Sequence, residues 1–190
     1  MIVSIHQPEH FPYLGYFQKM ARAEVFVFLD NVNYRKNYFQ NRNRFLNRNG
    51  VEEWFTIPVP KNSVKEHIKD VVPIEGPWRN KLVKQHKQHF GLSLSKIYDN
   101  EKLIDINIAS IEYCAIRLLI DDVKFIRASD LNVHGSKSEL LANICKELGA
   151  TKYISGPSGE DYLEMKYFDG IEVEFHNPKV PDIYTTLSHL

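Results

Sequence analysis

The apolar positions near the start of the chain fall into two short runs, separated by a segment of helical character. The first run covers residues 2–5, the intervening segment ends near Arg22, and the second run covers residues 25–29. Short continuous apolar runs are typical of strands buried on both faces, and parallel strands of this kind are joined by helices. The pattern therefore predicts a strand, a helix and a second strand of an α/β protein.

The rest of the chain continues this alternation. Helices are predicted at residues 78–90, 103–120 and 136–149, and strands at residues 124–128, 151–155 and 171–175. Four prolines between residues 58 and 77 predict an irregular excursion. The order of elements predicts a single α/β domain over residues 1–190, with three layers: a mainly parallel sheet with helices on both faces.

The predicted helix ends carry cap signals. Gly91 and Gly149 follow two of the helices, where glycine adopts the left-handed backbone of a C-cap. Ser136 and Glu139 have the Ser-x-x-Glu spacing of a capping box, which satisfies free amides at a helix start. Amides at a helix start also attract anions, so Ser136 and Lys137 are candidates for substrate binding. Both interpretations stay open.

Polar side chains follow several of the predicted strands. They are His6, Gln7 and His10 after the first strand, Asp30 after the second, and Ser155, Gly156 and Asp161 after a later one. Ligands of open parallel sheets collect at the carboxyl ends of the strands. We therefore expect these residues to converge on one pocket, with His6 and Asp30 in the catalytic roles. The alternative is structural: a hydrogen-bonded His6, a turn capped by Asp30, and surface loops.

The most basic segment covers residues 34–48, with five cations, several aromatic residues and no acid. Guanidinium groups hold phosphate by paired hydrogen bonds, and aromatic faces stack on bases or sugar rings. The segment predicts a contact with phosphate or a nucleotide through Asn41, Arg42 and Arg44. Two alternatives remain: a hairpin that turns at Asn49-Gly50 without a ligand, or contact with single-stranded RNA.

The overall charge gives no net attraction to nucleic acid or to an anionic membrane, because 24 Lys plus Arg balance 24 Asp plus Glu, so any anion binding must be local. The lack of a signal peptide pattern and of a long apolar stretch predicts a cytoplasmic protein. Cys114 and Cys145 lie in apolar helical patterns, which predicts buried thiols. His86 and His89 show no zinc pattern, and no P-loop, hydrolase or dinucleotide motif occurs.

Several motifs together resemble the WbqC-like family. In chain order they are His6-Gln7-Pro8, FPYLGYFQK at residues 11–19, Val27-Phe28-Leu29-Asp30, Gln40-Asn41-Arg42-Asn43, Gly135-Ser136-Lys137, Leu148-Gly149-Ala150, Tyr153-Ile154-Ser155-Gly156 and Asp161-Tyr162-Leu163. The resemblance extends over nearly the whole chain. The family is named after bacterial O-antigen gene clusters, and its members commonly occur beside genes for amino-sugar and nucleotide-sugar synthesis, which implies a substrate of that class.

The first strand, its histidine loop and the next helix are also similar to the nucleotidyltransferase-like fold of adenylyl-transferring and pantothenate-synthetase-like enzymes. In those enzymes a histidine pair in this loop steadies ATP phosphates. His6 and His10 are separated by three residues, which is wider than the usual His-x-Gly-His spacing. The similarity implies ATP with magnesium as the cofactor to test.

The resemblance to the WbqC-like family implies an enzyme of bacterial surface-polysaccharide biosynthesis that acts on an amino sugar or a nucleotide-linked sugar, whereas the residues themselves predict only a pocket. Acyl or aminoacyl transfer to the sugar amine, or ATP-dependent ligation, is the expected reaction class. The alternative is a non-catalytic module that binds a nucleotide sugar or RNA through residues 34–48. The family's usual continuation after Lys179 is longer, which implies that part of a site is absent.

Overall fold

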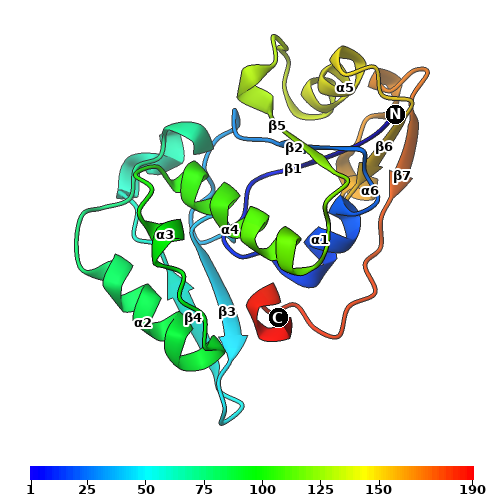
Figure 1. Cartoon of the computed structure of the whole chain (residues 1–190). Helices are drawn as coiled ribbons and strands as arrows, with labels where there is room; N and C mark the ends of the chain where they lie inside the picture. Colours follow the sequence, from blue (N-terminus) through cyan, green and yellow to red (C-terminus); the bar gives the residue numbers. More distant parts are fainter. The chain divides into compact units, whose positions relative to one another are not determined.

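The computed structural model describes residues 1–190 (Figure 1). The chain forms two compact units, each built from separate segments. The first unit comprises residues 1–7, 15–29 and 120–181, and the second comprises residues 8–14, 30–119 and 182–190. That the two units make a single domain stays a prediction.

The first unit contains a five-stranded sheet with the strand order β5-β2-β1-β6-β7. Its strands are β1 (Ile2–His6), β2 (Val25–Phe28), β5 (Lys124–Arg127), β6 (Lys152–Ser155) and β7 (Glu172–Phe175). All four neighbouring pairs are parallel. The central strands β1 and β2 are mostly buried, whereas the outermost strands β5 and β7 are more exposed. Burial on both faces explains why the apolar runs of β1 and β2 are nearly continuous.

Helices cover both faces of this sheet. α1 (Leu14–Met20) connects β1 to β2, and α5 (Lys137–Glu147) connects β5 to β6 in the opposite direction across the sheet. Right-handed connections that run in opposite directions place their helices on opposite faces, and Figure 1 shows α1 and α5 on the two sides of the sheet. The structure thus confirms the predicted α/β fold with a parallel sheet flanked by helices.

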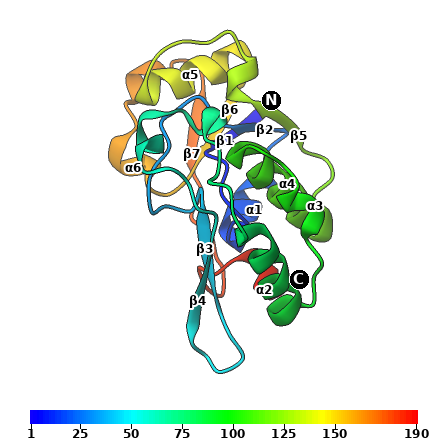
Figure 2. The same cartoon turned by 90° about the vertical axis from the view of Figure 1, so that its left-hand side faces the viewer.

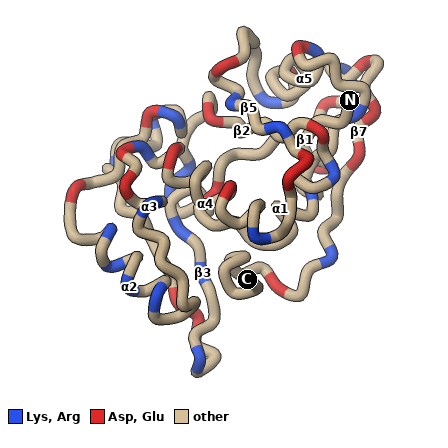
Figure 3. Tube along the Cα trace, viewed as in Figure 1, with Lys and Arg blue, Asp and Glu red and all other residues tan.

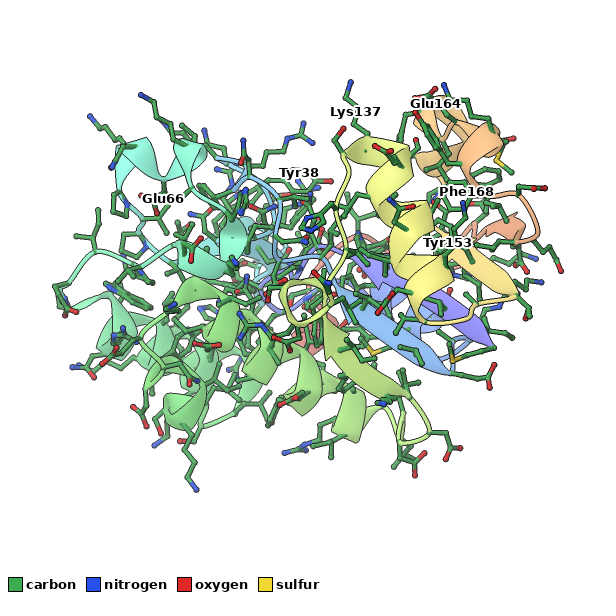
Figure 4. The ribbon with its side chains drawn as sticks, turned by 90° about the horizontal axis from the view of Figure 1, so that it is seen from above. Tyr38, Glu66, Lys137, Tyr153, Glu164 and Phe168 are labelled. Atoms are coloured by element: carbon green, nitrogen blue, oxygen red, sulfur yellow. The ribbon has the colours of Figure 1, made fainter.

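Aromatic side chains pack the helical layers onto the sheet. On the α1 face, the ring centroid of Tyr16 lies 5.3 Å from that of Phe26. On the other face, the rings of Tyr153 and Phe168 stack at 5.5 Å, and Figure 4 shows both beside α5. The short helix α6 (Gly159–Tyr162) and the 3₁₀ turns η3 (Ala128–Asp130) and η4 (Met165–Tyr167) complete the first unit.

The second unit combines an antiparallel hairpin with helices. Its elements are β3 (Arg42–Leu46), β4 (Glu52–Thr56), η1 (Lys61–Lys65), η2 (Ile68–Asp70), α2 (Trp78–Phe90), α3 (Ser95–Tyr98), α4 (Leu103–Arg117) and η5 (Thr186–His189). α2 runs alongside the hairpin and contacts β4 (Figure 2). The hairpin turn around Asn49-Gly50 and the left-handed C-cap of α2 at Gly91, with a φ of 72°, agree with the prediction.

Two local predictions differ from the structure. The capping box at Ser136 is wrong, because this side chain makes no cap hydrogen bond and the next residue, Lys137, has a φ of 50° that departs from helical geometry. The helix predicted to reach residue 120 ends at Arg117, because Leu119 has a left-handed φ of 57°. Residues 58–77 contain η1 and η2 within the predicted irregular excursion. Both cysteines are free and buried, as predicted.

Candidate functional site

Three strands of the first unit, β6, β1 and β2, end side by side at one edge of the sheet. β1 is central: the chain passes from it to β2 on one side and later returns from β5 to β6 on the other side. Such a reversal of strand order is a topological switch point, and open α/β sheets bind ligands beyond the strand ends there. His6 is the last residue of β1 and Ser155 the last residue of β6. Both predicted residues therefore lie at this edge.

The imidazole of His6 is held against α1 by Tyr16. The two rings stack with centroids 4.6 Å apart, and the Tyr16 hydroxyl donates a hydrogen bond to the carbonyl of Gln7 at 3.4 Å. Burial lowers the pKa of His6 well below 6.5, and the positive charge of Lys19 lowers it further. His6 is therefore a neutral imidazole at physiological pH, in the protonation state that a general base requires.

The buried ammonium group of Lys19 is a feature of this edge that sequence reasoning missed. Lys19 is only 3% exposed, its Nζ donates to the carbonyl of Ile5 at 3.0 Å, and it lies 5.8 Å from the ring centroid of Phe26. The three-residue spacing from Tyr16 to Lys19 places both side chains on one face of α1. This spacing from an aromatic residue could have indicated that Lys19 is buried, but a lysine on a helix normally indicates a face exposed to solvent.

The side chain of Ser155 leaves the sheet on the face opposite to His6. The register pairs Ser4 with Ile154, so the alternation of side chains along β1 and β6 separates His6 from Ser155. Ser155 is buried, its hydroxyl bonds to Tyr153, and its Oγ would lie 2.1 Å from a Cβ added at Gly159. The structure therefore places Ser155 in the packing beneath α6.

The remaining predicted residues of the first unit lie on its surface. Gly156 is partly buried directly after β6, while Ser136, Lys137 and Asp161 are exposed. Figure 4 shows Lys137 pointing outward from the start of α5. A residue that the prediction omitted, Ser138, makes the contact at this helix start, because its Oγ accepts a hydrogen bond from the backbone amide of Glu164 at 3.1 Å.

In the second unit, His10 belongs to a buried chain of polar rings. The Tyr98 hydroxyl lies 3.1 Å from Nε2 of His10 and 2.5 Å from Nε2 of His86. Burial lowers the pKa of His10 well below 6.5 and that of His86 to about 3, and burial raises the pKa of Tyr98 well above 10. All three rings are neutral and are at most 1% exposed, so His10 lies in the core of the unit.

Buried side-chain amides fix the loop that follows β1. Asn43 Nδ2 donates to the carbonyls of His10 and Phe11 at 3.2 and 2.7 Å, and Asn107 Nδ2 donates to the carbonyl of Pro8 at 3.1 Å. Asn41, predicted to bind substrate, is also buried and donates to the carbonyl of Ile57 at 2.9 Å. The Asn residues of the Gln-Asn-Arg-Asn motif therefore stabilise the backbone.

Arg42 of this motif and Arg44, which follows the motif, lie on the opposite, outward face of the hairpin. Their guanidinium carbons lie 4.5 Å (Arg42) and 5.4 Å (Arg44) from the ring centroid of Trp54, which is 38% exposed. Arg44 also forms an ion pair with Glu52 at 3.1 Å and lies 5.8 Å from the Tyr184 ring. Sequence reasoning missed Trp54 and Tyr184, because their positions depend on strand register and on a distant segment.

Asp30 lies in the second unit, two residues after the end of β2. It is fully buried, and its carbonyl accepts a hydrogen bond from the amide of Lys69 at 3.0 Å. No three His, Cys, Asp or Glu side chains of the chain are grouped so that they could hold a metal ion. None of the helices combines the length and the apolar character needed to span a bilayer.

The fold defines an α/β protein with polar side chains at the switch point of a parallel sheet. The WbqC-like protein family matches residues 7–189, and the chain belongs to this family. An uncharacterised protein of Mycobacterium tuberculosis (strain ATCC 25618 / H37Rv), Rv1507c, is 28% identical over an alignment that covers 90% of this chain and 79% of that protein. No solved structure shows a significant match.

Proposed function

We propose that the protein is a cytoplasmic enzyme of bacterial surface-polysaccharide biosynthesis. In this proposal it transfers an acyl or aminoacyl group to the amine of an amino sugar or of its nucleotide-linked form. The family name, taken from O-antigen gene clusters, supports the substrate class. The observation that carries the reaction type is the neutral imidazole of His6 at the switch point of the sheet.

Amide formation requires that the attacking amine lose a proton. In the proposed step, the sugar nitrogen attacks the acyl carbonyl carbon, a C–N bond forms, and the bond from that carbon to the leaving group breaks with its electron pair. The amine proton passes to His6. Because the pKa of His6 lies well below 6.5, its ring is unprotonated at pH 7 and can accept this proton. The positive charge of Lys19 keeps the ring neutral and disfavours the imidazolium, so in the proposed step the proton moves on from His6 to the departing leaving group.

A turnover assay tests this function. The protein is incubated with nucleotide-linked and free amino sugars and three donor systems: acyl-coenzyme A, aminoacyl-tRNA, and an amino acid with ATP and magnesium. Mass spectrometry detects the acylated sugar. We expect His6→Ala to lower the rate at least about 100-fold, the contribution typical of a general base. His134→Ala, a matched change at an exposed histidine of the same unit, leaves the rate unchanged.

Two outcomes contradict the proposal. One is the absence of product with every donor and sugar, and the other is turnover by His6→Ala at the rate of the unaltered protein. Circular dichroism and melting temperature of both variants establish that a lost rate reflects lost chemistry.

The outward face of the hairpin favours a second candidate, a non-catalytic module that binds a nucleotide sugar or RNA. Arg42 and Arg44 lie against Trp54, and the Nε atoms of both arginines are buried without a hydrogen-bond partner. Arginine side chains can bind phosphate, and an exposed aromatic ring can stack on a base. RNA binding should weaken steeply with salt, survive His6→Ala and be lost in Trp54→Ala. Unchanged fluorescence of Trp54 during RNA and nucleotide-sugar titrations would refute this candidate.

A further inference from the structure

A polar groove lies along α2 in the second unit, between this helix and the β3–β4 hairpin. It consists of two adjoining recesses of about 710 and 320 Å³, which share Glu53, Gln88 and His89 as lining residues. Volumes in this range hold small-molecule ligands. None of these residues belongs to the edge of the sheet that carries His6, so the groove goes beyond the proposed function.

α2 supplies one wall of the groove through a regular stripe of polar residues. Asn80, Lys84 and Gln88 are four residues apart, and Lys81 and Gln85 repeat this spacing one position later. Residues at this spacing lie on the same helical face. Figure 3 marks the cations along this helix. A polar stripe on an isolated helix is a solvated surface, but here residues of the hairpin line the same recesses, so the stripe faces a partly enclosed volume.

Across the groove, the Glu53 carboxylate of the hairpin faces the His89 imidazole near the end of α2, and both are held in fixed positions. Glu53 Oε2 lies 3.4 Å from Nε2 of His89, and Glu53 Oε1 accepts a hydrogen bond from Asn47 Nδ2 at 2.7 Å. The His89 ring packs against Phe45, with centroids 4.7 Å apart, and the side chain is only 15% exposed. Polar groups held in one orientation by such contacts can recognise hydroxyl groups by their direction.

The charges and hydrogen-bonding groups of the groove define a ligand class. Lys81, Lys84 and Arg48 bring three positive charges against the one negative charge of Glu53, which favours an anion. The three amides of α2 offer both donors and acceptors, as sugar hydroxyls require. His89 supplies the one aromatic ring among the lining residues of the groove, whereas single-stranded RNA binds by stacking on several aromatic faces. We propose that this groove binds a phosphorylated sugar, with its phosphate on the cations and its hydroxyls on the amides and Glu53.

The test is an NMR titration of the ¹⁵N-labelled full chain with N-acetylglucosamine 1-phosphate, beside N-acetylglucosamine and inorganic phosphate as separate probes. We expect shift changes over residues 47–53 and 77–89, and a lower Kd for the sugar phosphate than for either fragment. Lys84→Gln should raise this Kd about tenfold, the effect of losing one hydrogen bond to a charged group. Lys87→Gln removes the same charge outside the groove and should change it by less than about twofold.

Several results would overturn the proposal. Equal affinity for inorganic phosphate and the sugar phosphate would mean anion binding without sugar recognition. Equal losses in the two lysine variants would mean general attraction to charge, and tighter binding of a short single-stranded RNA would assign the groove to another ligand. Binding of the probe in the groove should persist in His6→Ala, so failure of the proposed enzyme activity and failure of this site are separate outcomes.

Discussion

Acid should destabilise the second unit through the buried imidazole of His86. The ring is fully buried among Phe11 and Phe55 and stacks on Tyr98. Burial lowers the pKa of His86 to about 3, and the positive charge of His89 contributes in the same direction. The unfolded chain exposes the ring, whose pKa there is 6.5. Between pH 6.5 and 3 the unfolded state therefore binds one more proton, so the free energy of unfolding falls as the pH falls.

The size of this effect follows from the two pKa values of His86. A difference of one bound proton changes the free energy of unfolding by about 1.4 kcal/mol per pH unit, so at pH 4.5 the loss from this ring is about 3 kcal/mol. That is a large share of the roughly 5–15 kcal/mol that stabilise a typical protein. Burial also lowers the pKa of His10 well below 6.5, which steepens the loss in the same pH window.

Urea unfolding between pH 7 and pH 4.5, followed by tryptophan fluorescence, measures this slope, because both tryptophans, Trp54 and Trp78, lie in the second unit. His86→Phe keeps an aromatic ring among Phe11, Phe55 and Tyr98 and removes the group that binds the proton. At pH 7 it should cost about 1 kcal/mol, from the lost hydrogen bond to Tyr98. Its slope should be shallower than that of the unaltered protein by about 1.4 kcal/mol per pH unit. Equal slopes for His86→Phe and the unaltered protein would refute the reasoning. His67→Gln, at an exposed histidine, is the control and should keep the slope of the unaltered protein.

Two further predictions concern packing and use the same unfolding measurement, with far-UV circular dichroism as the probe for the first unit. Gly159→Ala should lower the free energy of unfolding by about 1–3 kcal/mol through overpacking, because the new Cβ would lie 2.1 Å from Ser155 Oγ. Gly156→Ala is the control, because no atom lies within 4 Å of its new Cβ. Equal stabilities of the two variants would contradict this prediction. Asn43→Ala should cost about 1–3 kcal/mol, because it removes the hydrogen bonds to the buried carbonyls of His10 and Phe11, of which the Phe11 carbonyl still accepts one from the Thr185 hydroxyl. An unchanged urea midpoint would show that the loop does not depend on Asn43.

The α/β architecture was predictable from the sequence, because strands buried on both faces need nearly continuous apolar residues. Residues 2–5 and 25–29 meet this requirement, and polar loops mark where they end. The formation of a second compact unit within the connection from β2 to β5 was not predictable, because no change in composition marks its limits.

The candidate site was only partly predictable, because side-chain direction depends on long-range register. The position of His6 at a strand end follows from local sequence, but the opposite direction of Ser155 follows only once the pairing of β1 with β6 is known. The burial of Lys19 likewise depends on a carbonyl of β1. Asn41 and Arg42 are neighbours in one polar motif, and only the alternation of the hairpin separates the buried amide from the outward cation.

The measurement that tests the central claim most directly is an NMR pH titration of the His6 imidazole, assigned with the His6→Ala variant, in the unaltered protein and in Lys19→Met. The account predicts a midpoint well below 6.5 in the unaltered protein, and a higher midpoint in Lys19→Met because the neighbouring positive charge is gone. A midpoint at or above 6.5 in the unaltered protein would contradict the account, because burial and the positive charge of Lys19 would then not lower the pKa of His6.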